Sequence, residues 1–158
     1  MAYGAMDVDL AEVELSTLVG QVTGEYQDKL DEAGLTLVCK NTDGELRVSA
    51  DSNLLWRVLD NLFVNVLKYA MPGTRVYVEA GEKEEGVTLS ISNISKAELG
   101  ISGDELMERF VRGDGSRNTE GSGLGLSIAG SLMELMGGKV VIQVDGDMFK
   151  AVLRLKKS

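Results

Sequence analysis

The sequence predicts an α+β domain, a two-layer α/β sandwich in which helices cover one face of a mixed, mostly antiparallel sheet. Three observations predict this fold. Helical and strand-like segments are interleaved along the chain, and strand-like segments come in adjacent pairs joined by short turns, as antiparallel neighbours do. The strongest helical segment also has a broad apolar arc that must pack on a sheet. At 158 residues, 44% of them hydrophobic, the chain fits one domain with a real core.

In the first half of the chain, apolar residues recur at helical spacing in two segments, and two shorter segments between them are typical of strands. Gly34 can end the first helix, and Asp51 can cap the start of the second. Pro72 and Gly73 follow the second helix, as expected beyond a helix end. The predicted elements are a helix over 10–33, strands over 35–39 and 47–50 around a turn at 41–44, and a helix over 53–69.

The second half of the chain predicts two hairpins with a helical region between them. One hairpin turns in a charged segment at 81–86, and the other turns at Asp145-Gly146-Asp147. The polar, glycine-bearing segment between the hairpins is expected to be a mobile loop. The predicted elements are strands over 75–80 and 87–93, a short helix over 104–110, the loop over 111–123, a helix over 124–136, and strands over 139–144 and 149–155.

Composition excludes several classes of function. A net charge of −9 argues against a nucleic-acid partner, which usually needs a basic face. No apolar stretch approaches the roughly 20 residues of a membrane span. Histidine is absent, which excludes Ser-His-Asp and Cys-His catalysis. The single Cys39 lies in an apolar run and is expected to be a buried structural thiol. The domain is expected to span residues 7–158, after a nonspecific start at 1–6.

A polar stripe interrupts the helix predicted over 53–69. One narrow arc, at ~100° per residue, holds Arg57, Asn61, Asn65 and Lys68. Asparagine is unfavourable inside a helix, because its side chain competes for backbone hydrogen bonds. An amide oxygen is a good ligand for Mg²⁺, and a lysine beside it suits phosphate. A solvated helix face is the alternative, and the spacing alone leaves it open.

A glycine-rich segment leads directly into the helix predicted over 124–136. Its residues are Gly121, Ser122, Gly123, Leu124, Gly125 and Leu126. Glycines let a ligand approach bare backbone, and the first amides and dipole of the new helix favour an anion. A flexible hinge before a helix is the alternative. A P-loop is disfavoured because no Gly-Lys-Ser/Thr follows, and a Rossmann loop because no first strand comes before it.

Taken together and in this order, these features resemble the nucleotide-binding boxes of bacterial two-component sensor histidine kinases. Residues 59–69 resemble the asparagine box, 108–114 the phenylalanine box, and 121–128 the second glycine box. The resemblance covers residues 7–156 and is to the catalytic and ATP-binding (HATPase, GHKL-type) domain. It implies the Bergerat ATP-binding fold, shared with gyrase, mismatch-repair and chaperone ATPases, with ATP and Mg²⁺ as ligands.

The resemblance also implies roles for individual residues. Asn65 would coordinate Mg²⁺, Asn61 would help to orient the metal shell, Lys68 would meet phosphate, and Tyr69 would line the pocket. Residues 111–122 would form a flexible ATP lid, and its glycines would let it close. The catalytic residues implied are Asn61, Lys68, Arg109 and Arg112, the two arginines contacting the γ-phosphate or the domain that receives it. The ATP-binding residues implied are Asn61, Asn65, Lys68, Tyr69, Asn93, Gly121, Ser122, Gly123, Leu124, Gly125 and Leu126.

The residue type at position 61 distinguishes a kinase from an ATPase. The hydrolytic relatives of this fold carry a glutamate at the corresponding position, which activates water as a general base. An asparagine cannot accept a proton at neutral pH, so the site is suited to hold ATP for another acceptor. Phosphoryl transfer depends mainly on positioning and charge stabilisation, so it does not need that base.

The acceptor that the resemblance implies is a histidine, and this chain has none. The expected partners are therefore a histidine-bearing dimerisation domain of the same parent protein and a response regulator. The chain alone is expected to be inactive and monomeric. Its expected place is the cytoplasmic part of a membrane-anchored sensor kinase.

The chain departs from the family at the first glycine box, Asp-x-Gly-x-Gly. Asn93 stands at the aspartate, with Ser95 and Ala97 at the two glycines. Asn93 keeps an acceptor for the adenine amine but loses the charge, which could weaken the bond by ~1 kcal/mol or more. This leaves two alternatives open: a degenerate module that only senses nucleotide or docks a partner, and an anti-sigma-type serine kinase on the same fold.

Overall fold

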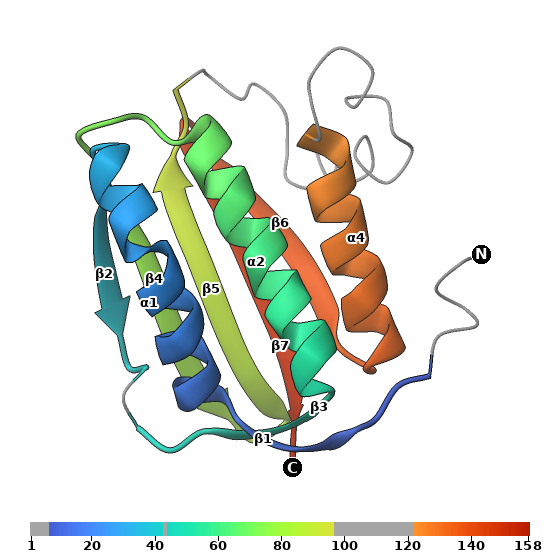
Figure 1. Ribbon diagram of the computed structural model, residues 1–158. Helices are drawn as coiled ribbons and strands as arrows, with labels where there is room; N and C mark the ends of the chain where they lie inside the picture. The colour runs from blue at the N-terminus through green and yellow to red at the C-terminus, as the bar shows by residue number, and fades with distance from the viewer. Residues whose placement is uncertain (1–6, 43, 97–121) are drawn as a thin grey trace.

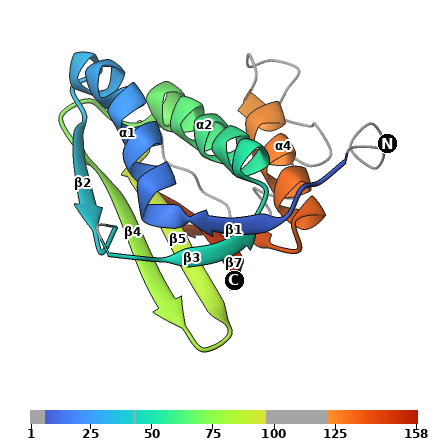
Figure 2. The same cartoon turned by 60° about the horizontal axis from the view of Figure 1, so that its bottom comes forward.

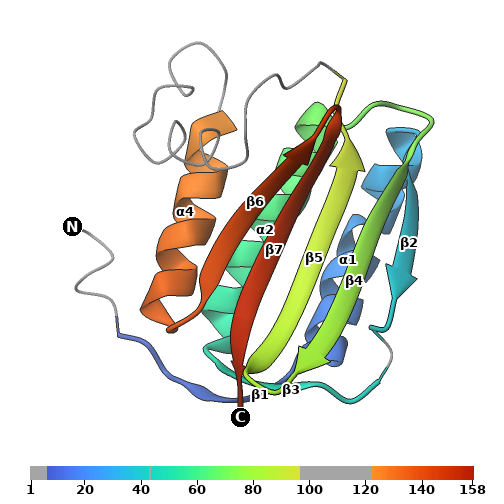
Figure 3. The same cartoon turned by 180° about the vertical axis from the view of Figure 1, so that it is seen from behind.

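The computed structural model describes residues 7–42, 44–96 and 122–158, and in it the helices lie on one face of a sheet (Figure 1). The helices are α1 (Leu15–Glu32), α2 (Ser52–Tyr69) and α4 (Ser122–Leu135). The strands are β1 (Ala11–Glu14), β2 (Thr36–Lys40), β3 (Arg47–Ala50), β4 (Arg75–Lys83), β5 (Gly86–Ile94), β6 (Lys139–Asp145) and β7 (Met148–Lys157). No described helix covers the other face of the sheet (Figure 3). The predicted two-layer α+β fold is confirmed.

The sheet is mixed and mostly antiparallel, as predicted. Within the described residues, the strand order is β1-β3-β7-β5-β4-β2, and β6 pairs with β7. The pairing of β2 with β4 is parallel, and the other pairings are antiparallel. The two predicted hairpins are present as β4–β5 and β6–β7. Gly146 adopts φ +61° in the turn of the second hairpin, as the Asp-Gly-Asp sequence indicates.

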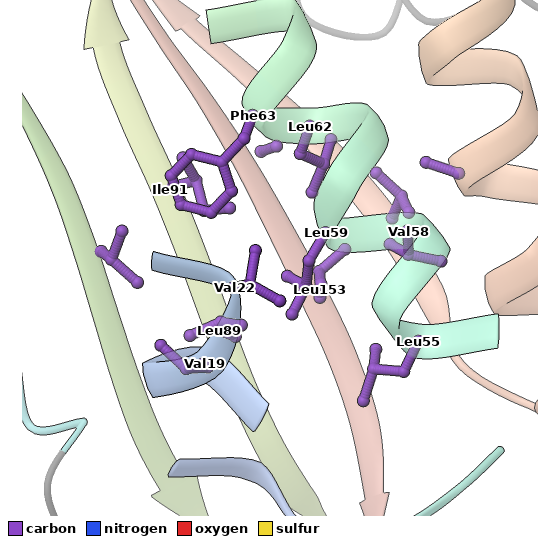
Figure 4. Packing of buried hydrophobic residues seen from close by; sticks show 14 of the residues in the cluster. Val19, Val22, Leu55, Val58, Leu59, Leu62, Phe63, Leu89, Ile91 and Leu153 are labelled. Atoms are coloured by element: carbon purple, nitrogen blue, oxygen red, sulfur yellow. The ribbon is translucent and has the colours of Figure 1, made fainter. Parts of the chain in front are cut away.

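Helix α2 forms the centre of the core because its apolar arc faces the sheet. Leu59 and Phe63 are buried against Leu89 and Ile91 of β5 and Leu153 of β7 (Figure 4). Burying a side chain of this size stabilises the fold by roughly 1.5–3 kcal/mol. Because one arc of α2 is fixed on the sheet, the direction of its polar stripe is fixed as well.

The end of α1 and the start of α2 form as the sequence predicts. Asp51 is the N-cap of α2 and accepts hydrogen bonds from the backbone amides of Asn53 (3.0 Å) and Leu54 (3.2 Å). Gly34 follows α1 with φ +76°, a conformation that glycine adopts without strain.

The predicted start of the first helix is wrong. Residues Ala11–Glu14 form strand β1, antiparallel to β3 (Figure 2), and α1 begins only at Leu15. The Glu14 carboxylate accepts a hydrogen bond from the Ser16 amide (3.1 Å) and caps the helix there. Leu10, which we counted on the apolar helical face, is 51% exposed. A few residues at helical spacing therefore do not outweigh pairing with a neighbouring strand.

Three further expectations need correction. The strands β4 and β5 extend into the segment 81–86 that was expected to be the turn: β4 ends at Lys83, and β5 begins at Gly86. The strands β2 and β3 flank a turn but do not pair with each other, because β2 joins β4 and β3 joins β1 and β7. Cys39 is exposed rather than buried, since it lies near the end of β2, which is an edge strand.

The helix expected over 104–110 and most of the loop expected over 111–123 lie outside the described residues. Among the residues that are described, no helix is long and apolar enough to cross a membrane.

Candidate nucleotide-binding site

The polar stripe of α2 runs from buried to exposed positions. Asn65 is only 8% exposed, Asn61 is half-buried, and Lys68 is exposed. A solvated helix face therefore does not account for Asn65, because its amide lies at a depth where apolar side chains are the norm. A polar group placed there costs free energy unless something binds it.

Asn93, near the end of β5, carries an open acceptor. Its side chain is 3% exposed, and its Oδ1 is fully buried without a hydrogen-bond partner. A buried acceptor left unpaired costs about 1–3 kcal/mol, so native proteins contain few of them. An amine of a bound base could supply the missing bond, which is the role the resemblance implies for Asn93.

Tyr69, the last residue of α2, provides the second such group. Its hydroxyl oxygen is also buried without a partner, and no other side-chain atom in the described part of the chain shares this state. The expected position of Tyr69 at a pocket wall is consistent with this, because a hydroxyl without a protein partner can serve a ligand.

Backbone hydrogen bonds bring Tyr69 and Asn93 to the same end of the molecule. The amide of Lys96 donates to the carbonyl of Tyr69 (2.8 Å), and the amide of Met71 donates to the carbonyl of Ile94 (2.7 Å). The amide of Ser95 also donates to the carbonyl of Asp147 (2.7 Å) in the β6–β7 turn. The end of α2, the end of β5 and this turn therefore form one rigid corner.

Helix α4 begins at the same end of the molecule (Figure 1). It packs beside α2 and runs in the opposite direction, so its N-terminus lies near the C-terminal end of α2. Leu126, in its first turns, is fully buried and anchors this end. The helix starts at Ser122, two residues before the predicted start, so Ser122 and Gly123 belong to the helix rather than to the loop. Its first backbone amides are suited to an anion.

Several predicted site residues cannot be placed. Arg109, Arg112 and Gly121 lie outside the described residues, as does Ala97. For Ser122, Gly123, Leu124 and Gly125 only the helical backbone is described. The structure thus brings together Asn61, Asn65, Lys68, Tyr69, Asn93 and the start of α4.

The donor set fits Mg²⁺ held largely by its substrate. No group of three or more Asp, Glu, Cys or His side chains that could hold a metal occurs in residues 7–42, 44–96 and 122–158. Mg²⁺ commonly takes only one or two protein oxygens together with waters and substrate phosphates. The amide oxygen of Asn65, a residue that is only 8% exposed, can be one of these protein ligands.

One hollow of the described surface does not coincide with this corner. It measures about 430 Å³ and lies on the open face of the sheet, lined by residues such as Lys83, Thr88 and Lys150. Neither this hollow nor a smaller one of about 220 Å³ near Arg47 includes an asparagine of the site. The buried polar atoms without partners, on Tyr69 and Asn93, lie at the corner instead.

The corner thus combines amide side chains, unpaired buried acceptors and a helix N-terminus on a two-layer α+β fold, and these groups are suited to phosphate and to a base. A sequence model of the histidine kinase-, DNA gyrase B- and HSP90-like ATPase family matches residues 50–157. The chain belongs to this family. The recognition of a sensor histidine kinase catalytic domain, with ATP as its ligand, is thereby confirmed.

Relatives and solved structures agree with this assignment. The probable sensor protein PcoS of Escherichia coli is 31% identical over 146 residues, covering 91% of this chain and 31% of PcoS. The chain therefore spans about a third of this relative's length. The catalytic domain of the histidine kinase ThkA, which a further structure shows with the response regulator TrrA, superposes with a TM-score of 0.82 at 23% identity, over 94% of this chain and 96% of that one. Full-length ShkA in complex with AMPPNP superposes with a TM-score of 0.75 at 25% identity, over 98% and 33%.

Sequence reasoning missed the contact between the β6–β7 turn and Ser95. This contact joins the carbonyl of Asp147 to a backbone amide, so no side-chain pattern could have indicated it. It holds the chain in place just after Asn93.

Proposed function

We propose that this chain binds Mg-ATP at the corner and supplies the γ-phosphate to a histidine on a separate dimerisation domain of the same parent protein. In that transfer, an imidazole nitrogen bonds to the γ-phosphorus as the bond to the β–γ bridging oxygen breaks, and ADP leaves. The chain would be the catalytic part of a two-component system whose phosphorylated histidine serves a response regulator.

The state of Asn61 and its neighbour Asp60 carries this proposal. Asn61 is half-buried on α2 and cannot act as a base. Asp60 is the adjacent carboxylate, but the Tyr26 hydroxyl of α1 donates a hydrogen bond to its Oδ1. Asp60 is thereby held toward α1, away from the polar stripe. A site without a free base beside the phosphates holds ATP for transfer rather than hydrolysing it.

In this proposal, each residue of the corner contacts a different part of Mg-ATP. The Asn93 Oδ1 accepts a hydrogen bond from the adenine amine, and Tyr69 lines the same wall. The first amides of α4 and the Lys68 ammonium bind phosphate oxygens. Asn65 holds Mg²⁺, which neutralises phosphate charge when bound. Asn61 helps to orient the other ligands of the metal. Arg109 and Arg112 remain proposed contacts of the γ-phosphate or of the acceptor domain.

We also propose a place for this domain within its parent protein. Its relatives include sensor proteins, and ThkA forms a complex with a response regulator. We infer that the parent is a membrane-anchored sensor whose catalytic part, spanning residues 7–158, faces the cytoplasm. The domain alone is a monomer and transfers no phosphate without its histidine-bearing partner.

A transfer assay tests the proposal. The chain is mixed with the histidine-bearing dimerisation domain of its parent and γ-labelled ATP, and the acid-labile, base-stable label on that domain is counted. Label should appear on the histidine with the native chain and should be lost with Asn65→Ala. Ser90→Ala, on the open face of the sheet, is the matched control and should transfer normally. ATP binding without any histidine label would instead indicate a nucleotide-sensing or docking module, and label on a serine would indicate a serine kinase.

A further inference from the structure

The open face of the sheet carries a group of cations that the nucleotide site does not use. In the strand register, Lys139 of β6 lies directly opposite Arg154 of β7, and Thr88 of β5 lies opposite Arg154 on the other side. Lys150 of β7 lies between Gln143 and Ser92 in the same way. Alternate residues of these strands are buried under the helices, so these side chains point to the uncovered face (Figure 3).

The pairing of Lys139 with Arg154 is unfavourable by itself. Like charges directly opposite each other on one face of a sheet destabilise the pairing. Within the described residues, no carboxylate lies within ion-pair distance of Lys139, Lys150 or Arg154; the ion pairs found there involve Arg47 and Lys157. These three cations therefore have no ion-pair partner among the described residues.

Two of these cations, Lys150 and Arg154, line a hollow of about 430 Å³. The hollow forms because β5 contributes two short side chains, Thr88 and Ser90, between longer side chains on the neighbouring strands. Gly86 has no room for a side chain, since a Cβ there would lie 2.4 Å from the carbonyl oxygen of Leu155. Lys83, Lys150 and Arg154 form the walls, and Gln143 adds an amide.

Acidic side chains gather on the first helix, on the other side of the sheet. The chain carries a net charge of −9, and α1 on the helical side exposes an acidic surface. Its exposed carboxylates are Glu25, Asp28, Asp31 and Glu32. These carboxylates lie on the helical side, whereas Lys83, Lys150 and Arg154 line the hollow on the open face.

We propose that the open face is a docking surface for a short acidic segment of a partner protein. Carboxylates of that segment would pair with Lys150, Arg154 and Lys139, and its backbone would meet the hydroxyls and amide of the hollow. Glu79 and Glu85 border the same face and would repel a continuous polyanion. A protein segment can carry carboxylates for the cations and a basic side chain for the glutamates. For that reason we favour it over a nucleic acid or an anionic membrane.

Amide chemical shifts of the native chain test the proposal directly. A short glutamate-rich peptide is titrated into the isotope-labelled chain, and a peptide with glutamine in place of each glutamate is the control. The glutamate peptide should shift amides of β5, β6 and β7 on the open face, and its affinity should fall as salt screens the charges. The double variant Lys150→Glu/Arg154→Glu should bind it at least about tenfold more weakly.

Matched variants separate docking from loss of fold. Arg57→Glu makes the same kind of charge reversal on the exposed side of α2 and should bind the glutamate peptide within about twofold of the native chain. Lys150→Gln/Arg154→Gln removes the charges without adding carboxylates and should also weaken binding. Unchanged unfolding temperatures show that the variants are folded.

Three results would overturn the proposal. The first is a glutamate peptide that does not bind, or that binds the double variant as tightly as the native chain. The second is tighter binding of this face to a thymidine oligonucleotide or to phosphatidylglycerol vesicles than to the peptide. The third is self-association that the double variant abolishes, which would make a second copy the occupant. None of these results depends on ATP binding, so they are independent of the proposed function.

Discussion

Asn93 shows how a single residue can connect stability with function. Its Oδ1 is buried without a partner at the end of β5, in a corner held by three backbone hydrogen bonds. Nothing in the described fold uses this acceptor. A ligand that donates to it would recover the free energy that the folded protein loses by burying it. The same holds for the hydroxyl of Tyr69.

Replacing Asn93 by leucine should separate these two roles. Leucine has the same branched shape and number of side-chain heavy atoms but no acceptor, so the free energy of unfolding should stay the same or rise by up to about 1 kcal/mol. ATP affinity should fall by about fivefold or more, since one base contact of ~1 kcal/mol is lost. Chemical denaturation and calorimetry measure the two quantities. A variant that loses stability and keeps its ATP affinity would show that Asn93 is structural.

The reverse substitution, Asn93→Asp, should strengthen ATP binding. A carboxylate accepts a stronger hydrogen bond from the adenine amine than an amide does. It cannot donate to the guanine oxygen, whereas the asparagine amide can. Affinities for ATP and GTP analogues measure the effect: the ratio of ATP to GTP affinity should rise by about fivefold or more. An unchanged ratio would show that Asn93 does not read the base.

At the scale of elements, α2 determines the site because both its ends and its middle are fixed. Asp51 caps its start, and Tyr26 of α1 stacks on Phe63 at 5.3 Å between ring centroids and donates to Asp60. The Lys96 amide donates to the Tyr69 carbonyl at the end of α2 (2.8 Å), so Asn61 and Asn65 lie between fixed points. Their direction is therefore set by contacts that make no use of a ligand.

Removal of the N-cap should destabilise α2 as a unit. Asp51→Ala leaves the amides of Asn53, Leu54 and Asp9 without their acceptor, and should lower the free energy of unfolding by about 1–2 kcal/mol. Asp51→Asn is the control, because asparagine caps about as well as aspartate and should restore most of the stability. Equal losses in both variants would mean that the charge of Asp51, rather than the cap, stabilises the helix.

Tyr26→Phe should weaken the contact between α1 and α2 in a pH-dependent way. The variant keeps the ring stack but loses the bond to Asp60, so at neutral pH it should unfold about 1–2 kcal/mol more easily. Burial, followed by the hydrogen bond to Asp60 and the charge of Asp60, raises the pKa of Tyr26. The folded state thus holds this proton more tightly than the unfolded state, which releases it above about pH 10.

The stabilisation from Tyr26 is therefore present below about pH 10 and is lost as pH rises above it. The difference in stability between the native chain and Tyr26→Phe should be constant from pH 7 to 9 and should shrink above pH 10. Denaturant unfolding across this range measures it. A difference that grows at high pH would contradict the proposed hydrogen bond.

At the scale of the whole molecule, the fold could be predicted better than the site. The apolar arc of α2 and the alternation in the hairpins follow from local periodicity, and they indicate two layers because each needs a surface to cover it. The start of α1 could not be predicted in this way. Residues 11–14 become a strand through pairing with β3, which is nearly forty residues away in sequence. Local patterns carry no information on such pairing.

The site shows the same limit. The spacing of Asn61 and Asn65 indicates one helical face, but the burial of Asn65 appears only once the elements have packed together. The sequence places Asn93 on a strand, but its open acceptor results from the corner that three segments build around it. The alignment of Lys139, Lys150 and Arg154 on the open face likewise appears only once the strands are in register.

Calorimetry with a non-hydrolysable ATP analogue tests the central claim most directly. The native chain should bind one analogue per molecule, and affinity should fall when Mg²⁺ is chelated. Asn65→Ala should bind at least about tenfold more weakly and lose most of its dependence on Mg²⁺, whereas Ser90→Ala should match the native chain. If the native chain does not bind the analogue, or if Asn65→Ala leaves affinity and Mg²⁺ dependence unchanged, then the corner between α2, β5 and α4 is not the Mg-ATP site.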